Sequence, residues 1–139
     1  MHTRIAVAVL FLLGCATPED GFVGRFSGSY ECSGSFDDGS PYTEGPSTQR
    51  IAIERATDGS VYLAGTCTIP LDVISPTRAE VVPATCNTML TDGTPSRTSF
   101  VSGLVALDEP RAAYSMQIVV EAQTFTLTAT CTFDGTRIE

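Results

Sequence analysis

The most constraining feature of this chain is a strict alternation near its C-terminal end. Every second residue is apolar over 125–133, and each residue between them is threonine: Phe125, Leu127, Ala129, Cys131 and Phe133 alternate with Thr124, Thr126, Thr128, Thr130 and Thr132. A period of two places the two sets on opposite faces of a strand, whereas a helix would mix them. Threonine is β-branched, suits a pleated sheet and tolerates water. The segment is therefore predicted to be a strand with one core face and one solvent face.

The same period recurs along most of the chain, and turn-forming residues separate the segments. The sequence predicts strands near 26–33, 48–55, 61–68, 78–86, 98–107, 112–121 and 124–133. Asp-Gly pairs between β-type segments are strong hairpin signals. Gly, Pro, Ser and Asp predict loops at 34–47 and 87–97, irregular chain before residue 78, and a final turn at Asp134-Gly135.

These segments predict an all-β fold. Roughly seven or eight antiparallel strands, joined mostly by hairpins, indicate a meander that closes as a small barrel, with a β-sandwich as the alternative. Closure removes the exposed edges that a single open sheet of this length would have to protect.

The cysteines favour a disulfide framework. Five cysteines leave one unpaired, but without Cys15 an even set of four remains: Cys32, Cys67, Cys86 and Cys131. Zinc binding is disfavoured because no pair has the C-x₂-C spacing. Three pairings are possible. Because the first and last strands of a closed meander are neighbours, the favoured pairs are Cys32 with Cys131 and Cys67 with Cys86.

The chain begins with a leader. A basic start at Arg4 is followed by an apolar run from Ile5 to Leu13, which is much shorter than the ~20 residues of a membrane-spanning helix. Residues 1–14 are therefore predicted to be a cleaved signal peptide. Ordinary secretory cleavage nearby is the alternative to the lipid attachment described next.

Leu12-Leu13-Gly14-Cys15 resembles the lipobox of bacterial lipoproteins, although Leu13 is larger than the usual Ala or Ser. The resemblance implies a diacylglyceryl group on the Cys15 thiol, cleavage after Gly14 and acylation of the new amino group. Several acyl chains anchor a protein stably, whereas one chain is marginal. Ala16 follows the cysteine, and the resemblance then implies the outer membrane of the cell envelope, on its periplasmic or outer side.

The predicted organisation is a signal peptide at 1–14, a lipidated cysteine and tether at 15–25, and one β-domain at 26–139. The chain has 16 Asp and Glu residues against 8 Lys and Arg residues, a net charge of −8. That acidity argues against nucleic acid as a partner, because phosphate contacts need clustered Lys and Arg. The predicted membrane contact is the lipid on Cys15.

Catalytic chemistry finds little support in the sequence. The one histidine, His2, lies in the leader, and the chain has no lysine, which disfavours Ser-His-Asp catalysis, imidazole metal ligation and Schiff bases. Paired carboxylates such as Asp37-Asp38 and Asp108-Glu109 fall in turn signals, where Asp bonds its own backbone. We therefore expect no catalytic residues, no metal site, no cofactor and no enzyme activity.

Two functions remain open. The favoured one is a non-catalytic, disulfide-stabilised β-domain for structural or protein-interaction use. The other is a small-ligand carrier, suggested by tyrosines and phenylalanines that the alternation directs inward. Gly28-Ser29-Tyr30 resembles the opening of lipocalin-like barrels, without the tryptophan of their Gly-x-Trp motif. A carrier requires a cavity of roughly 300 Å³ or more that reaches solvent.

Overall fold

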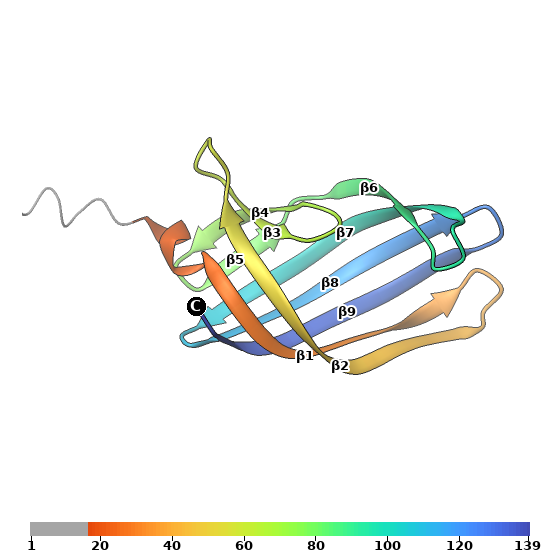
Figure 1. Cartoon of the computed structure of the whole chain (residues 1–139), viewed down its shortest axis with the longest axis horizontal. Helices are drawn as coiled ribbons and strands as arrows, with labels where there is room; N and C mark the ends of the chain where they lie inside the picture. The colour runs from red at the N-terminus through yellow and green to blue at the C-terminus, as the bar shows by residue number, and fades with distance from the viewer. Residues whose placement is uncertain (1–16) are drawn as a thin grey trace, which may run out of the picture.

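The computed structural model describes residues 17–139, so the predicted leader and the lipidation site Cys15 lie outside the described residues. A short 3₁₀ helix is followed by nine antiparallel strands (Figure 1). The elements are η1 (Pro18–Gly21), β1 (Gly24–Phe36), β2 (Pro41–Arg55), β3 (Val61–Ala64), β4 (Ile69–Ser75), β5 (Arg78–Val81), β6 (Ala84–Met89), β7 (Pro95–Asp108), β8 (Arg111–Ala122) and β9 (Thr126–Arg137). The predicted all-β class is confirmed. Within this described range, no helix has the length and apolar character needed to cross a membrane.

Eight of the strands form a closed ring that is not evenly distributed round its axis. The sheet order is β5-β4-β3-β2-β1-β9-β8-β7-β6, and a second pairing of β5 with β7 closes the ring. Strand β6 lies outside the ring and pairs with the first half of β7. The predicted meander is confirmed, and its first and last strands are neighbours over eleven residue pairs, from Phe26–Arg137 to Phe36–Leu127.

The two ends of the molecule differ. At the end that carries η1 and the C-terminus, β3, β4 and β5 complete the ring; we call this part the closed half (Figure 1). At the other end, β1, β2, β7, β8 and β9 extend beyond those short strands and, with β6, make a curved sheet with free edges; we call this part the open half. Its edges are residues 41–51 of β2 and strand β6.

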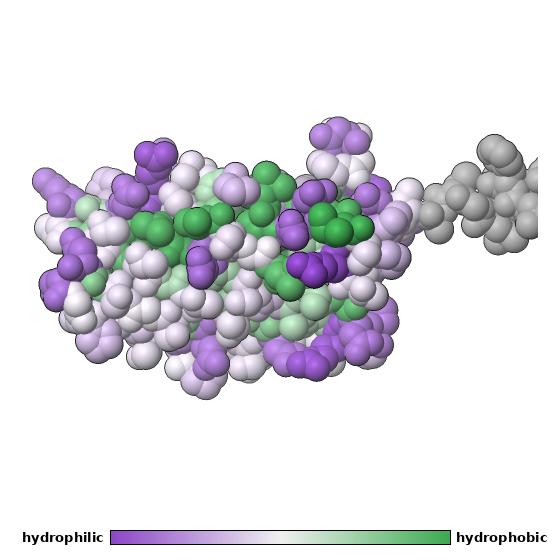
Figure 2. Space-filling view, turned by 180° about the vertical axis from the view of Figure 1, so that it is seen from behind, coloured by the Kyte–Doolittle hydropathy of each residue, from purple (hydrophilic) through white to green (hydrophobic). Residues whose placement is uncertain are grey.

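The hydrophobic core fills the closed half. Its largest side chains with under 2 % exposure are Phe22, Phe26, Phe133, Ile53, Val61 and Val105. The outer face is mixed: Figure 2 shows hydrophilic and hydrophobic groups interspersed, with the hydrophobic ones mainly in the upper half of that view. Strand β1 separates the core from this surface: Phe26 and Cys32 on its inner face are buried, while Arg25 and Glu31 on its outer face are exposed.

The folded domain begins before residue 26, where the predicted tether ended. Phe22 is fully buried in the core, and the Arg137 guanidinium donates to the carbonyl oxygens of Gly21 (2.5 Å) and Val23 (2.9 Å). Arg137 also lies 4.7 Å from the centre of the Phe26 ring. The segment 18–25 is therefore part of the domain, because the apolar side chain of Phe22 packs in the core although its neighbours in sequence are polar.

The prediction of a loop over residues 34–47 is wrong. The chain turns only over Asp37–Ser40, and the remainder extends β1 and β2 into a long hairpin. Proline is tolerated at Pro41 and Pro46 because this part of β2 is an edge that donates to no further strand. Gly45, with φ +82°, lies at the register shift between Tyr30 and Cys32, where an added Cβ would be 2.5 Å from the Tyr30 carbonyl oxygen.

Four further segments differ from prediction. Residues 69–75 form strand β4, although irregular chain was expected, and the strand expected at 78–86 is divided at Pro83 into β5 and β6. The loop expected at 87–97 shrinks to Leu90–Thr94. Asp134-Gly135 is no turn, because β9 continues between β1 and β8, and the Phe133 ring lies where a Gly135 side chain would be.

Candidate functional site

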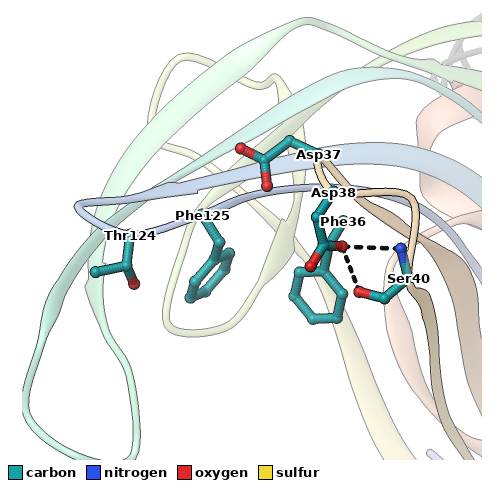
Figure 3. Close-up of a pocket in the computed structure, with 6 residues that line it drawn as sticks. All are labelled: Phe36, Asp37, Asp38, Ser40, Thr124 and Phe125. Atoms are coloured by element: carbon teal, nitrogen blue, oxygen red, sulfur yellow. Dashed lines mark hydrogen bonds between the residues drawn. The ribbon is translucent and has the colours of Figure 1, made fainter.

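The carboxylates considered for catalysis lie in turns, as their sequence context predicts. Asp38 accepts hydrogen bonds from the Ser40 N–H (2.8 Å) and hydroxyl (2.5 Å) at the β1–β2 turn (Figure 3). These bonds from Ser40 hold the pKa of Asp38 below its ordinary value. Asp58 makes the same contacts with Ser60 in the β2–β3 turn. Such carboxylates are ionised and committed to turn geometry, so they are poor proton donors.

The open half ends in a shallow hollow of about 590 Å³ at the hairpin tips. Phe36 and Phe125 pack edge to face, with ring centres 5.4 Å apart, and Asp37, Asp38 and Thr124 surround them (Figure 3). Edge-to-face packing is a favoured geometry for aromatic pairs and stabilises the two turns against each other. Residues 17–139 contain no group of three or more His, Cys, Asp or Glu arranged to hold a metal ion.

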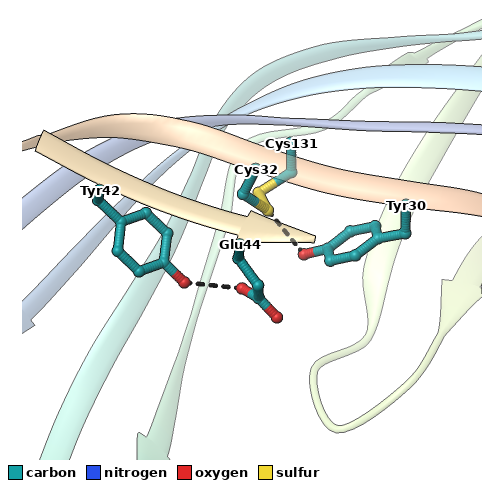
Figure 4. The surroundings of a disulfide bond; sticks show 5 residues. All are labelled: Tyr30, Cys32, Tyr42, Glu44 and Cys131. Atoms are coloured by element: carbon teal, nitrogen blue, oxygen red, sulfur yellow. Dashed lines mark hydrogen bonds between the residues drawn. A yellow bond between two sulfur atoms is a disulfide. The ribbon is translucent and has the colours of Figure 1, made fainter. Parts of the chain in front are cut away.

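The cysteines are joined as Cys32–Cys131 and Cys67–Cys86. Cys32 and Cys131 are directly opposite each other on β1 and β9, with Cα atoms 4.0 Å apart, and both are buried on the inner face. The Tyr30 hydroxyl donates to the Cys32 Sγ over 2.9 Å, and the Tyr42 hydroxyl donates to Glu44 Oε2 over 2.7 Å (Figure 4). This disulfide forms part of the inner wall where the two halves meet.

The second disulfide connects parts of the sheet that are not neighbours. Cys67 lies in the connection between β3 and β4, and Cys86 lies on β6. β3 was predicted to continue to Thr68, but it ends at Ala64 and the chain turns away toward β6. The bond therefore ties the β3–β4 connection across the interior to the far edge of the open half.

A cavity of about 360 Å³ lies beneath that connection, at the junction of the two halves. Its walls are mainly apolar and come from seven strands and from the β3–β4 connection: Tyr30, Gln49, Arg50, Ile51, Leu63, Ala64, Gly65, Thr66, Cys67, Ile69, Phe100, Tyr114, Met116, Ile118 and Cys131. The volume corresponds to about twelve water molecules at the ~30 Å³ that each occupies in the liquid. It falls within the ~300–1,000 Å³ that is usual for small-molecule sites.

Two tyrosines supply the polar groups of this wall. Burial raises the pKa of Tyr114 well above its ordinary value, and burial together with the Glu44 carboxylate raises the pKa of Tyr30. Both phenols are thus neutral over the physiological range. The Tyr114 ring is stacked on Phe133, with centres 5.5 Å apart, and its hydroxyl has no hydrogen bond from the rest of the described chain. It is available to a ligand in the cavity.

The cavity lies against the outer face of the sheet where β2 and β3 separate. Their last residue pair is Ala52 and Ala64; beyond it, β2 continues through Ile51 while the other chain bends at Gly65. The interior cavity and a hollow of about 360 Å³ on the outer face share Arg50, Ile51, Ala64 and Gly65 as lining residues. We call this separation of β2 from β3, beyond Ala52 and Ala64, the β2–β3 gap.

Sequence reasoning found part of this site. Tyr30 and Tyr114 were expected to point inward, and the structure brings them together in one wall. Arg50, Gly65 and the β2–β3 gap were missed. The local sequence gave no signal for the gap, because Gly65 and Cys67 continue the alternation of Val61 and Leu63, whereas Cys67 is bonded to Cys86 on a distant strand.

Comparison with known proteins supports the fold alone. No protein-family model matches this chain, and no curated protein matches it in sequence. Among solved structures, it is similar to a crystal structure from Bacteroides fragilis described as a "putative outer membrane protein", with a TM-score of 0.50 and 14% identity. The match covers 86% of this chain and 52% of that one, so the present chain spans about half the length of its structural neighbour. The chain is a disulfide-stabilised β-domain of this general architecture.

Proposed function

We propose that the protein is exported, anchored to the cell envelope by lipid on Cys15, and binds a small, largely apolar molecule in the cavity between its two halves. The single observation that supports ligand binding best is the cavity of about 360 Å³, whose wall at the β2–β3 gap also lines a hollow on the outer face. It exceeds the volume of roughly 300 Å³ that a carrier requires. Burial of an apolar ligand there contributes about 25 cal/mol for each Å² removed from water.

Three observations support the location. Leu12-Leu13-Gly14-Cys15 resembles a lipobox, and the other four cysteines are paired, as oxidising compartments permit. The structural neighbour is described as a "putative outer membrane protein", which agrees with the outer membrane that Ala16 implies. The binding is proposed to be non-catalytic, because the chain after Cys15 contains neither histidine nor lysine.

Native mass spectrometry of protein extracted from its own membranes tests the ligand. We expect the intact protein to carry a mass beyond that of the acylated chain, which is lost on denaturation. The matched variant is Ile118→Trp, which fills the cavity from its own wall and should abolish the extra mass. Wild-type protein that carries no small molecule, and takes up none from an apolar mixture, contradicts ligand binding.

Cys15→Ala tests the anchor independently. The variant should move from the detergent-extracted membrane fraction to the soluble fraction, since the acyl chains have no other attachment site in the proposal. If it remains bound to membrane, the lipobox interpretation fails, whatever the outcome of the ligand experiment.

Protein interaction is the second candidate, and one surface favours it. Val82 (40% exposed) precedes an outer hollow of about 470 Å³ lined by Pro83, Ala84, Thr85, Ser99, Phe100 and Val101, the last of which is 47% exposed. Exposed apolar groups around a hollow are typical of contact surfaces. Val101→Glu should abolish such a contact and leave the interior ligand in place.

A further inference from the structure

The outer hollow at the β2–β3 gap is lined by charged side chains, whereas the interior cavity is mainly apolar. Arg50 lines both the interior cavity and the outer hollow, and Arg25 lines the outer hollow beside it. Arg25 has a loose ion pair with Glu139, 3.7 Å between Nη1 and Oε2. Arg50 is exposed, and none of the residues 17–139 forms an ion pair with it. Glu139 lines the same outer hollow, so in a chain of net charge −8 this hollow holds one paired arginine, Arg25, and one arginine without an ion pair from residues 17–139, Arg50.

The geometry of the gap limits how a ligand can enter. The interior lies on one side of the sheet and the outer hollow with Arg25 and Arg50 on the other, and the place where β2 and β3 separate, beyond Ala52 and Ala64, lies between them. Ile51 and Gly65 are common to the two sides. A molecule that fills both spaces must be narrow at the gap, apolar within and polar outside.

From this placement we infer that the ligand is an amphipathic monoanion: a single apolar chain or ring that passes through the β2–β3 gap into the cavity, with an anionic head group bound by Arg50 outside. The inference rests on the proposed ligand binding and adds its chemical class and its route. The carboxylate or other oxyanion accepts hydrogen bonds from the Arg50 guanidinium, whose planar donors match such groups. A neutral molecule would fill the interior without using Arg50, and a cationic head group would be repelled by Arg50, since Arg25 is paired with Glu139.

Gly65 has a defined part in this route. A Cβ added there would meet only the Cys67 carbonyl oxygen, at 3.6 Å, which is an ordinary contact. The glycine is therefore not required by a close backbone approach. Its lack of a side chain keeps the β2–β3 gap open between the interior and Arg50.

Three ligands with the same chain and different heads test the class: octanoate, octanol and octylamine. Calorimetric titration uses the full chain carrying Cys15→Ala, which bears no lipid and needs no detergent. We expect octanoate to bind about five- to tenfold more tightly than octanol, in line with one charge-assisted contact near solvent, and octylamine to bind most weakly. Added salt should weaken octanoate binding and leave octanol binding nearly unchanged.

Substitutions at the gap identify the contact. Arg50→Gln should reduce octanoate affinity about five- to tenfold, to the level of octanol, whereas Arg50→Lys should retain most of the preference. Arg97→Gln is the matched control, because Arg97 is exposed on β7, distant from the gap in the sheet, and carries the same charge. Gly65→Leu should abolish binding of all three ligands, and Gly65→Ala should preserve it. Circular dichroism verifies that each variant retains its sheet.

The outcomes separate this inference from the broader proposal. Equal affinity for octanol and octanoate, or octanoate binding unaffected by Arg50→Gln, overturns the monoanion and leaves a neutral apolar ligand in the cavity. Gly65→Leu with unchanged binding overturns the route. If none of the three ligands binds, cavity binding itself is overturned.

Discussion

The closed and open halves of this molecule share the five long strands β1, β2, β7, β8 and β9, yet they are stabilised in different ways. In the closed half, eight strands surround a core in which Phe22, Phe26 and Ala79 are fully buried. In the open half, the inner face carries the Cys32–Cys131 disulfide and a hydroxyl cluster in which Thr88 contacts Ser96 (2.7 Å) and Thr98 (3.3 Å). The comparison shows that sheet closure depends on the short strands β3, β4 and β5, and that the cavity forms where they end.

Removal of the Cys32–Cys131 bond should have the largest effect. The bond joins residues 99 apart in sequence, for which the loop-entropy estimate gives about 4–5 kcal/mol. Cys32→Ala with Cys131→Ala should therefore lower the free energy of unfolding by about that amount, measured by urea denaturation with fluorescence from the tyrosines. An unchanged midpoint would show that strand pairing alone holds β1 to β9.

A matched pair of phenylalanine substitutions compares the halves directly. Phe26→Ala, in the core of the closed half, should cost about 3–5 kcal/mol, because a large side chain is replaced by a cavity. Phe125→Ala, at the hairpin tips, should cost about 1 kcal/mol, the contribution of its aromatic contact with Phe36. Thermal denaturation of both variants measures the difference. Equal costs would mean that the two halves are equally well packed.

The Cys67–Cys86 bond connects the halves, and its loss should destabilise the open half more than the closed half. The estimate for its 19-residue separation is about 3 kcal/mol. Cys67→Ala with Cys86→Ala should also speed amide hydrogen exchange in β6, which pairs only with β7, while β4 between its two neighbours stays protected. Uniform acceleration in both strands would contradict the division into halves.

The tyrosines give the smallest effect. Burial and the hydrogen bond to Glu44 raise the pKa of Tyr42 to about 12, and the pKa values of Tyr30, Tyr62 and Tyr114 are also raised. A raised pKa in the folded state stabilises the protein fully below pH 10, and the contribution is lost as pH rises through the folded value. Tyrosinate absorbance should hence appear at higher pH in native protein than in urea. Coincident titration curves would contradict the packing described around these phenols.

The comparison also explains which parts of the fold were predictable. The alternation of Phe125 to Phe133 predicts β9 because one face is buried against the core and the other is wet. The Gly and Pro residues of 34–47 predict a loop because they disfavour an interior strand, but an edge strand tolerates both. The predicted boundary between tether and domain at residue 25 differs from the structure because Phe22, an apolar residue in a polar segment, is buried in the core.

The candidate site was harder to predict than the fold. Inward tyrosines follow from the period of two, which is local information. The β2–β3 gap forms where the chain leaves β3 toward Cys67. The disulfide partner of Cys67 is Cys86 on β6, a strand that is not a neighbour of β3 in the sheet. Gly65 and Cys67 continue the alternating pattern in sequence, so local reasoning extends β3 through them, whereas the long-range bond determines where the strand ends.

The adjacency of β1 and β9 has a consequence for biosynthesis. A polypeptide emerges from the ribosome, and threads through any export channel, with its N-terminus first. β1 can pair with β2 early, but its other edge stays unsatisfied until the last twelve-residue strand has emerged. The ring is therefore completed after translation of the whole chain, and a nascent chain stalled before residue 126 presents a bare strand edge to chaperones or to a second copy of itself.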